Sequence, residues 1–195
     1  MEMIKKKEMR TFDITKLKTR DATEAEPSMI TGYAAVFNSK TNIGGWFEEI
    51  IEPGAFSRSL SENGDVRALF NHNWDKVLGR TKSGTLRLEE DSRGLKFEID
   101  VPNTSAGRDL AESMDRRDID QCSFGFWITE ETWDYSVEPA LRTIHEVELY
   151  EISVVSIPAY EDTEASLVRS KEIAKEVEQR MKILKQIKGV LDNEN

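Results

Sequence analysis

Residues 83–102 read SGTLRLEEDSRGLKFEIDVP, and this stretch decides the kind of fold to expect. Apolar and charged residues alternate on both sides of the polar tetrapeptide 91–94, which ends in a glycine. An alternation of period two buries one face of a strand and leaves the other in water, and a short polar segment with glycine is typical of a hairpin turn. The stretch therefore predicts an antiparallel β-hairpin. Its buried face would carry Leu86, Leu88, Leu95, Phe97, Ile99 and Val101.

Segments with the β-branched and aromatic content of strands recur on both sides of this hairpin. Between them, a short helix is expected at 55–60 and an amphipathic helix over 103–118, where an Asn-Thr-Ser cap precedes apolar residues at helical spacing. Because closure removes exposed sheet edges, we expect a mainly β domain over 1–164, a closed or strongly curved antiparallel β-barrel with flanking α-helices. Its other predicted strands lie at 9–14, 29–39, 65–72, 121–131 and 140–158.

The remaining residues, 165–195, form a predicted C-terminal helical tail. Apolar residues recur there at intervals of three and four, which is typical of one face of an amphipathic helix. Such a helix can pack on its own domain or pair with another helix, and the sequence leaves both open. The apolar positions are Ile173, Val177, Met181, Leu184, Ile187 and Leu191.

Charge is distributed unevenly along the 195 residues, whose formal net charge is -10. Seven Lys and Arg stand against three Asp and Glu in residues 1–20, and seven against five in residues 166–195. The middle of the chain is left with thirteen basic and twenty-nine acidic residues. Such an acidic domain would repel a phosphate backbone, so we expect no nucleic-acid partner.

Other classes of protein are disfavoured by what the sequence lacks. The single cysteine, Cys122, excludes an intramolecular disulfide, and no apolar run approaches the roughly 20 residues of a membrane span. The N-terminal MEMIKKKEMR is not followed by the apolar segment of a secretory signal. No glycine-rich phosphate loop or paired CxxC motif indicates a cofactor or a metal. We expect a soluble, cytoplasmic protein.

A candidate nucleophile lies in DIDQCSFGFWI, residues 118–128. On a strand, Cys122, Phe124 and Phe126 share one face, and Ser123 and Gly125 share the other. The aromatic face is expected to be the core, which makes Cys122 a packing residue. Ser123 would then stand beside a residue without a side chain, where another group can approach closely. A purely structural serine would show the same pattern.

A serine nucleophile needs a base, and the base needs an orienting partner. Of the two histidines, His72 follows a predicted strand and should keep its ring accessible. His145 shares the pleat side of Val147 and Leu149, so we expect it to point toward the packed face. His72 is therefore the candidate base, with an ordinary strand-end histidine as the alternative.

The orienting partner is expected in HEVELYEISVV, residues 145–155. The apolar phase of this strand changes near residues 150 and 151, as it would at a β-bulge. Across such a bulge, Glu146, Glu148 and Glu151 could all face the same side as Ser123. Exposed glutamates on a strand are otherwise simply solvated.

Five blocks, in this order and spacing, resemble the prohead maturation proteases of tailed bacteriophages: GYAAVFN, IEPGAFSRSL, VRALFNHNWDKVLG, SAGRDLAESMDRRDIDQCSFGFWI and VELYEISVVSIPAY. The resemblance covers roughly residues 29–161. Members of this family resemble the herpesvirus assemblins and have a small β-barrel flanked by helices. They are serine proteases that act inside the assembling capsid on scaffold and capsid-protein segments, and commonly on themselves.

Carried to this chain, the resemblance implies Ser123 as nucleophile and His72 as base. The third member is expected to be an acid on the strand after the serine, with Glu148 preferred and Glu151 as the runner-up. His145 would copy the second histidine of the assemblins, but its expected inward phase argues against it. The adjacent arginines that help form the assemblin oxyanion site have no equivalent in PAYEDTEASLVR, so the oxyanion donors stay unassigned.

The implied function is a serine endopeptidase of procapsid maturation, located in the host bacterial cytoplasm inside the assembling procapsid. Its partners would be the major capsid protein and its scaffold segment, with a homo-oligomer possible in principle, and the tail could dock on them and be removed by self-cleavage. Two alternatives remain at this point. One is a non-catalytic assembly or scaffolding factor on the same fold, and the other is a generic acidic β binding module.

Overall fold

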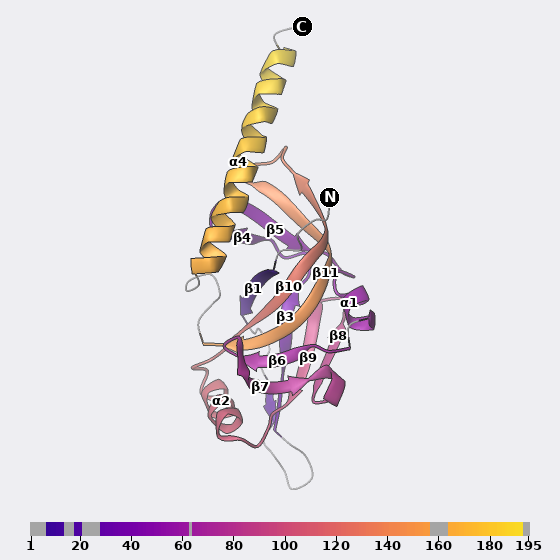
Figure 1. Cartoon of the computed structure of the whole chain (residues 1–195), viewed down its shortest axis with the longest axis vertical. Helices are drawn as coiled ribbons and strands as arrows, with labels where there is room; N and C mark the ends of the chain where they lie inside the picture. Colours follow the sequence, from indigo (N-terminus) through magenta and orange to yellow (C-terminus); the bar gives the residue numbers. More distant parts are fainter. Residues whose placement is uncertain (1–6, 14–17, 21–27, 63, 157–163, 193–195) are drawn as a thin grey trace.

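The computed structural model describes residues 7–13, 18–20, 28–62, 64–156 and 164–192. The described strands form two sheets, and the helices lie around them (Figure 1). The larger sheet has the order β1-β10-β11-β5-β4, with β6 and β7 attached to it through β11. Its strands are β1 (Lys7–Asp13), β4 (Thr41–Ile43), β5 (Phe47–Ile51), β6 (Arg67–Phe70), β7 (Asn73–Arg80), β10 (Gln121–Asp134) and β11 (Ala140–Val155).

The smaller sheet has the order β2-β3-β9-β8 and contains the predicted hairpin. Leu88 pairs with Phe97 across it, and Tyr33 on the next strand donates its hydroxyl hydrogen to Asp91 in the turn at 2.6 Å. The hairpin prediction is therefore confirmed. The strands of this sheet are β2 (Lys18–Arg20), β3 (Met29–Val36), β8 (Leu86–Glu90) and β9 (Gly94–Asp100).

The mainly β class with a few helices is confirmed, but of the expected closed or strongly curved barrel, no closed form is found among the described strands. The described strands form two separate sheets, and β11 pairs in parallel with both β5 and β6. β11 is 16 residues long, and it pairs with β5 over 140–144 and with β6 over 151–154. Between β5 and β6, helix α1 (Ser57–Glu62) and the turn before it accept hydrogen bonds from backbone N–H groups of β11. Leu149 N donates to Ser59 Oγ at 2.8 Å, and Val147 N donates to the Ala55 carbonyl at 2.9 Å.

The core contains the aromatic face of β10, as predicted. Phe124 stacks on Phe126 with centroids 4.7 Å apart and meets Phe56 edge-on at 5.5 Å. Cys122 is fully buried among these residues, and burial raises the pKa of its thiol, which confirms it as a packing residue. Helix α2 (Ser105–Asp115) closes one end of the core with Leu110 and Met114. Its predicted cap is present at Thr104, whose hydroxyl accepts from Gly107 N.

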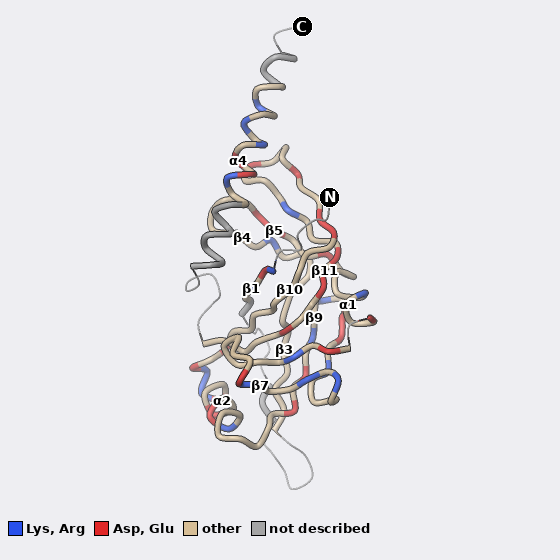
Figure 2. Tube along the Cα trace, viewed as in Figure 1, with Lys and Arg blue, Asp and Glu red and all other residues tan. Residues whose placement is uncertain are grey.

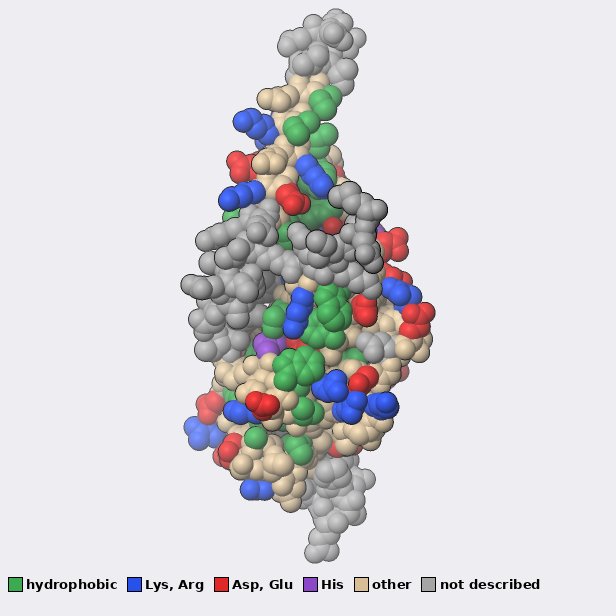
Figure 3. Space-filling view, in the orientation of Figure 1, with side chains coloured by type: hydrophobic (Ala, Val, Ile, Leu, Met, Phe, Trp, Pro, Cys, Tyr) green, Lys and Arg blue, Asp and Glu red, His purple; other side chains and the backbone are tan. Residues whose placement is uncertain are grey.

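The predicted C-terminal helix is α4 (Glu164–Asp192), which projects beyond the sheets (Figure 1). Val177 is buried, and Arg180 donates to the Tyr135 hydroxyl at 2.7 Å, so the middle of α4 rests on the loop between β10 and β11. Both basic and acidic positions occur along its described part (Figure 2), and hydrophobic side chains are exposed where it projects (Figure 3). These exposed residues are Ile183, Leu184 and Ile187. No described helix is long and apolar enough to span a membrane.

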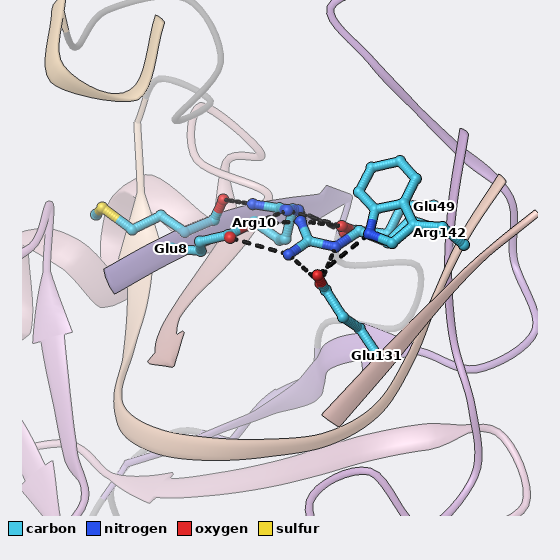
Figure 4. A network of polar contacts seen from close by, with 7 residues as sticks. Glu8, Arg10, Glu49, Glu131 and Arg142 are labelled. Carbon is cyan, nitrogen blue, oxygen red and sulfur yellow. Dashed lines mark hydrogen bonds and ion pairs between the residues drawn. The ribbon is translucent and has the colours of Figure 1, made fainter. Parts of the chain in front are cut away.

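A buried ion network ties together strands that are distant in sequence (Figure 4). Arg10 on β1 bonds Glu8 at 2.5 Å and Glu49 on β5 at 2.5 Å. Arg142 on β11 bonds Glu8 at 3.0 Å and also reaches Glu131 on β10. Burial alone would raise the pKa of Glu8, but the two guanidinium groups outweigh burial and lower it to about 2. The network joins β1 to the strands that carry the candidate site.

Candidate active site

Strands β10 and β11 place the candidate residues on one face. Ser123 pairs directly with Ser153, and Gly125 pairs with Glu151. Residues directly opposite in an antiparallel pair point to the same side, with Cβ atoms about 4.5–5.5 Å apart. These four residues therefore share the side of the sheet that faces away from Phe124. Ser123 and Ser153 are fully buried, and Glu151 is 1% exposed.

The predicted β-bulge lies at Tyr150. The register passes from Gly125 and Glu151 to Phe126 and Leu149, so Tyr150 is the extra residue on β11. The bulge keeps Glu151 and Glu148 on the same side of the strand, as the sequence suggested. Glu148, however, pairs with Trp127, which lies four residues beyond Ser123, or about 13 Å along a strand.

Gly125 leaves space that Tyr150 and Glu151 occupy. A Cβ atom at this position would lie 2.5 Å from the Tyr150 hydroxyl oxygen and 2.6 Å from Glu151 Oε1. Atoms that are not bonded cannot approach so closely without displacement. The missing side chain therefore allows the acid to lie beside the serine strand.

His72 occupies the tip of the β6–β7 hairpin. Phe70 pairs with Asn73, so the two-residue turn consists of Asn71 and His72, with φ angles of 52° and 55°. Two successive positive φ angles are typical of a type I′ turn, whose second position is usually glycine. Asn71 is held on β11 because its N–H donates to the Val154 carbonyl and its Oδ1 accepts from Ser156 N, both at 2.9 Å. The turn therefore holds the imidazole close to β11.

Glu151 holds the His72 ring. The Nδ1 atom lies 2.9 Å from Glu151 Oε1, and Ser153 Oγ donates to Glu151 Oε2 at 2.6 Å. A carboxylate can only accept, so His72 carries its proton on Nδ1, and in the neutral ring Nε2 is left as an acceptor. The His72 side chain is 24% exposed.

Two atoms of this site lack a partner among the residues that the structure describes. They are His72 Nε2 and Ser123 Oγ, both buried and neither in a hydrogen bond. Leaving a buried polar atom unpaired costs about 1–3 kcal/mol, and such atoms are rare outside functional sites. Catalytic hydrogen bonds are often absent before substrate binds. Ser123 Oγ and His72 Nε2 do not hydrogen-bond to each other in this structure, and proton transfer between them would need an approach to about 2.6–3.2 Å.

The other candidate residues have different surroundings. Neither ring nitrogen of His72 hydrogen-bonds to Glu148, since Nδ1 bonds Glu151 and Nε2 has no hydrogen-bond partner among the described residues. Glu148 instead acts on the charge of Arg58. Glu146 bonds Arg58 at 2.6 Å and Thr129 at 2.7 Å, and the hydrogen bond from Arg58 lowers the pKa of Glu146.

The inward orientation expected for His145 is wrong. A second irregularity lies beside it, where Glu130 pairs with Glu146 and Glu131 with Ile144. His145 is therefore an extra residue and turns away from the packed side. Its ring bonds Glu52 and Thr132, both at 2.8 Å, and stays 26% exposed.

Ser153 was missed in the sequence, although one signal was present. Positions 151 and 153 are two apart on a strand and so share a side. Once Glu151 was assigned to the side of Ser123, Ser153 belonged there too. Its hydrogen-bond partners are Glu151 on the same strand and the backbone N–H of His72 in the β6–β7 turn, and the contact with His72 cannot be predicted from the local sequence.

Comparisons with known proteins agree with this fold. The fold resembles that of the capsid assembly protease gp21 of bacteriophage T4, with a TM-score of 0.53 and 10% identity, over 76% of this chain and 96% of that one. The prohead protease of Escherichia phage T5 is 28% identical over 102 residues, which are 52% of this chain and 45% of that protein. The match thus spans less than half of that relative.

The family model described as caudovirus prohead serine protease matches residues 15–179. The chain therefore belongs to the caudovirus prohead serine protease family.

Proposed function

We propose that this chain is a serine endopeptidase that cleaves a capsid or scaffold protein during procapsid maturation. The observation that carries the proposal is the hydrogen bond between His72 Nδ1 and Glu151, next to a strand whose Ser123 has a buried hydroxyl. Family membership supports the same activity. The names of the two relatives, a prohead protease and a capsid assembly protease, support capsid protein as the substrate class.

In the proposed mechanism, Ser123 Oγ attacks the peptide carbonyl and its proton passes to His72 Nε2. Glu151 accepts the Nδ1–H throughout and stabilises the imidazolium that forms. The imidazolium then protonates the leaving amine, which departs and leaves an acyl-Ser123 ester. Water, deprotonated by the neutral His72, hydrolyses this ester, and the proton returns to Ser123.

Glu151 takes the orienting role here, in place of Glu148. The carboxylate that contacts His72 is the one that can fix its tautomer, and Glu151 does so at 2.9 Å. Glu148, opposite Trp127, belongs to the polar group around Arg58. Ser123 is fully buried, whereas His72 is partly exposed, so a peptide would approach from the His72 side.

Co-expression with the capsid and scaffold protein of the same genome, followed by intact mass measurement, tests the proposal. We expect defined cleavage products with the natural chain and none with Ser123→Ala or His72→Ala. Glu151→Gln should slow cleavage at least 100-fold, while Glu148→Gln, on the same face of β11, serves as the matched control and stays within a few fold. If Ser123→Ala left all processing unchanged, the proposal would be wrong.

The proposed setting is the inside of the assembling procapsid in the host cytoplasm, where α4 would dock on scaffold or on a neighbouring subunit. The exposed Ile183, Leu184 and Ile187 support such docking. A chain that ends at Ala165 should be packaged at least tenfold less well into proheads, measured by quantitative immunoblot of purified particles. Packaging at the natural level would contradict docking by α4. Removal of the tail by self-cleavage would appear as a matching mass loss that Ser123→Ala prevents.

A non-catalytic assembly factor remains the second candidate. The complete burial of Ser123 favours it, because a peptide carbonyl must reach the serine hydroxyl and Ser123 has no exposed surface in this structure. An assembly factor would still bind capsid protein when Ser123 is replaced by alanine, and assembly would proceed with no new cleavage product from either chain.

A further inference from the structure

We infer that Ser153 is a positioning residue that holds the acid and the base of the proposed protease together. This inference rests on the proposed function of Ser123, His72 and Glu151. Ser153 is fully buried and lies directly opposite Ser123 on β11. No part of its side chain needs to contact substrate for the role described below.

The Ser153 hydroxyl makes two hydrogen bonds of opposite direction. It donates to Glu151 Oε2 at 2.6 Å and accepts from the His72 backbone N–H at 3.2 Å. A hydroxyl has one hydrogen to donate, so the bond to Glu151 uses it. The Ser153 hydroxyl therefore links the Glu151 carboxylate to the His72 backbone and is not a second nucleophile. We call this pair of hydrogen bonds the clamp.

The clamp matters because the His72 turn is strained. Asn71 and His72 both have positive φ, which is unfavourable for residues other than glycine and costs on the order of 1–3 kcal/mol each. Such a turn persists only where surrounding contacts fix it. Asn71 is fixed by Val154 and Ser156, and the backbone of His72 is fixed by Ser153.

The bond to Glu151 adds a second effect. The two carboxylate oxygens have different partners, with Oε1 facing His72 Nδ1 and Oε2 facing Ser153 Oγ. The serine hydrogen bond thereby fixes the rotation of the carboxylate. One hydroxyl sets the direction of the imidazole through both its backbone and its acid partner.

Removing the hydroxyl should therefore affect the rate more than substrate binding. We expect Ser153→Ala to lower kcat about 10- to 100-fold with KM within a few fold, the size of effect that a slight misplacement of a catalytic base produces. With one hydrogen bond fewer to the carboxylate, the dependence of the rate on pH should change as well. Ser153→Thr keeps an Oγ atom and should recover most of the rate.

Ser59→Ala is the matched control. Ser59 is also a buried serine, and its Oγ accepts from the backbone N–H of Leu149 on the same strand, away from His72. Ser59→Ala should lose about as much free energy of unfolding as Ser153→Ala, measured by urea unfolding. Its pH profile should stay that of the natural chain. The substrate for all rate measurements is the purified capsid and scaffold protein of the same genome.

The outcomes separate the clamp from the activity itself. The inference is overturned if Ser153→Ala keeps the natural kcat, or if its kcat falls only as far as that of Ser59→Ala and its pH profile is unchanged. Ser153 is then merely structural, while the protease function stands. If Ser123→Ala still cleaves, the proposed function fails. A lowered kcat, a changed pH profile and recovery in Ser153→Thr together support the clamp.

Discussion

At the scale of single residues, Gly125 and the bulge at Tyr150 decide which acid lies beside the strand of Ser123. The small residue at 125 lets the Tyr150 ring and the Glu151 carboxylate lie against the serine strand. The same bulge residue, Tyr150, sets Glu151 rather than Glu148 opposite that glycine. The proposed nucleophile Ser123, the glycine at 125 and the bulge at Tyr150 thus form one local arrangement.

Gly125→Ala should damage the site. Its Cβ would lie 2.5 Å from the Tyr150 hydroxyl and 2.6 Å from Glu151 Oε1, so both must move and His72 loses its partner. We expect cleavage to fall at least tenfold and the free energy of unfolding to drop by about 1–3 kcal/mol, as overpacking typically costs. Gly64→Ala is the control, because a Cβ there meets nothing within 4 Å. Equal activity of the two variants would contradict this account of Gly125.

At this scale the sequence predicted part of the site. The alternation around Ser123 and the position of His72 after a strand could be read from residue types alone. The choice between Glu148 and Glu151 could not, because both lie on the same side and only the exact position of the bulge places one beside His72. His145 was misassigned for the same reason, since a second irregularity beside it reverses its side.

Among the elements, the β6–β7 hairpin is the one that carries His72, the proposed base. Its strand β7 was not predicted, because NWDKVLGR lacks a regular alternation and its first five residues are exposed. Strands β4 and β5 were missed as well, since they are only three and five residues long. The elements with strong alternation or a helix cap, such as β8, β9 and α2, were predicted correctly.

Asn71→Ala should loosen this hairpin. It removes the bonds from Asn71 to Ser156 and places alanine at a φ of 52°, which alanine adopts reluctantly. We expect a loss of about 1–3 kcal/mol in the free energy of unfolding and at least a tenfold slower cleavage. Asn38→Ala is the matched control, with a φ of 54° in an exposed turn on another part of the chain. It should lose stability but keep its activity, and a comparable loss of activity there would contradict the assignment.

Across the whole molecule, the buried ion network and the division into two sheets were beyond prediction. Glu8 and Arg142 are 134 residues apart in sequence, and no local pattern brings them together. The barrel was expected because closure hides sheet edges. In this chain, the short strands β5 and β6 pair in parallel with the long strand β11, and α1 contacts β11 between them.

The network predicts an acid dependence of stability. The pKa of Glu8 falls from 4.5 to about 2 on folding, so its contribution is complete above about pH 4.5 and is lost as pH falls toward 2. At 1.36 kcal/mol per pKa unit the contribution is roughly 3 kcal/mol. Urea unfolding should show Glu8→Gln well below the natural chain at neutral pH, with the gap narrowing at pH 3. A gap that stays constant would contradict this role, and Glu89→Gln, at an exposed site on β8, is the control.

The central claim is that Ser123 is a nucleophile activated by the His72–Glu151 pair. The most direct test is to treat the natural chain, Ser123→Ala and His72→Ala with a fluorophosphonate probe and to follow adduct formation by intact mass. We expect one adduct per natural chain, mapped to Ser123 by peptide mass, none in Ser123→Ala, and at least 100-fold slower labelling in His72→Ala. Labelling at another residue, or at the same rate without His72, would contradict the claim.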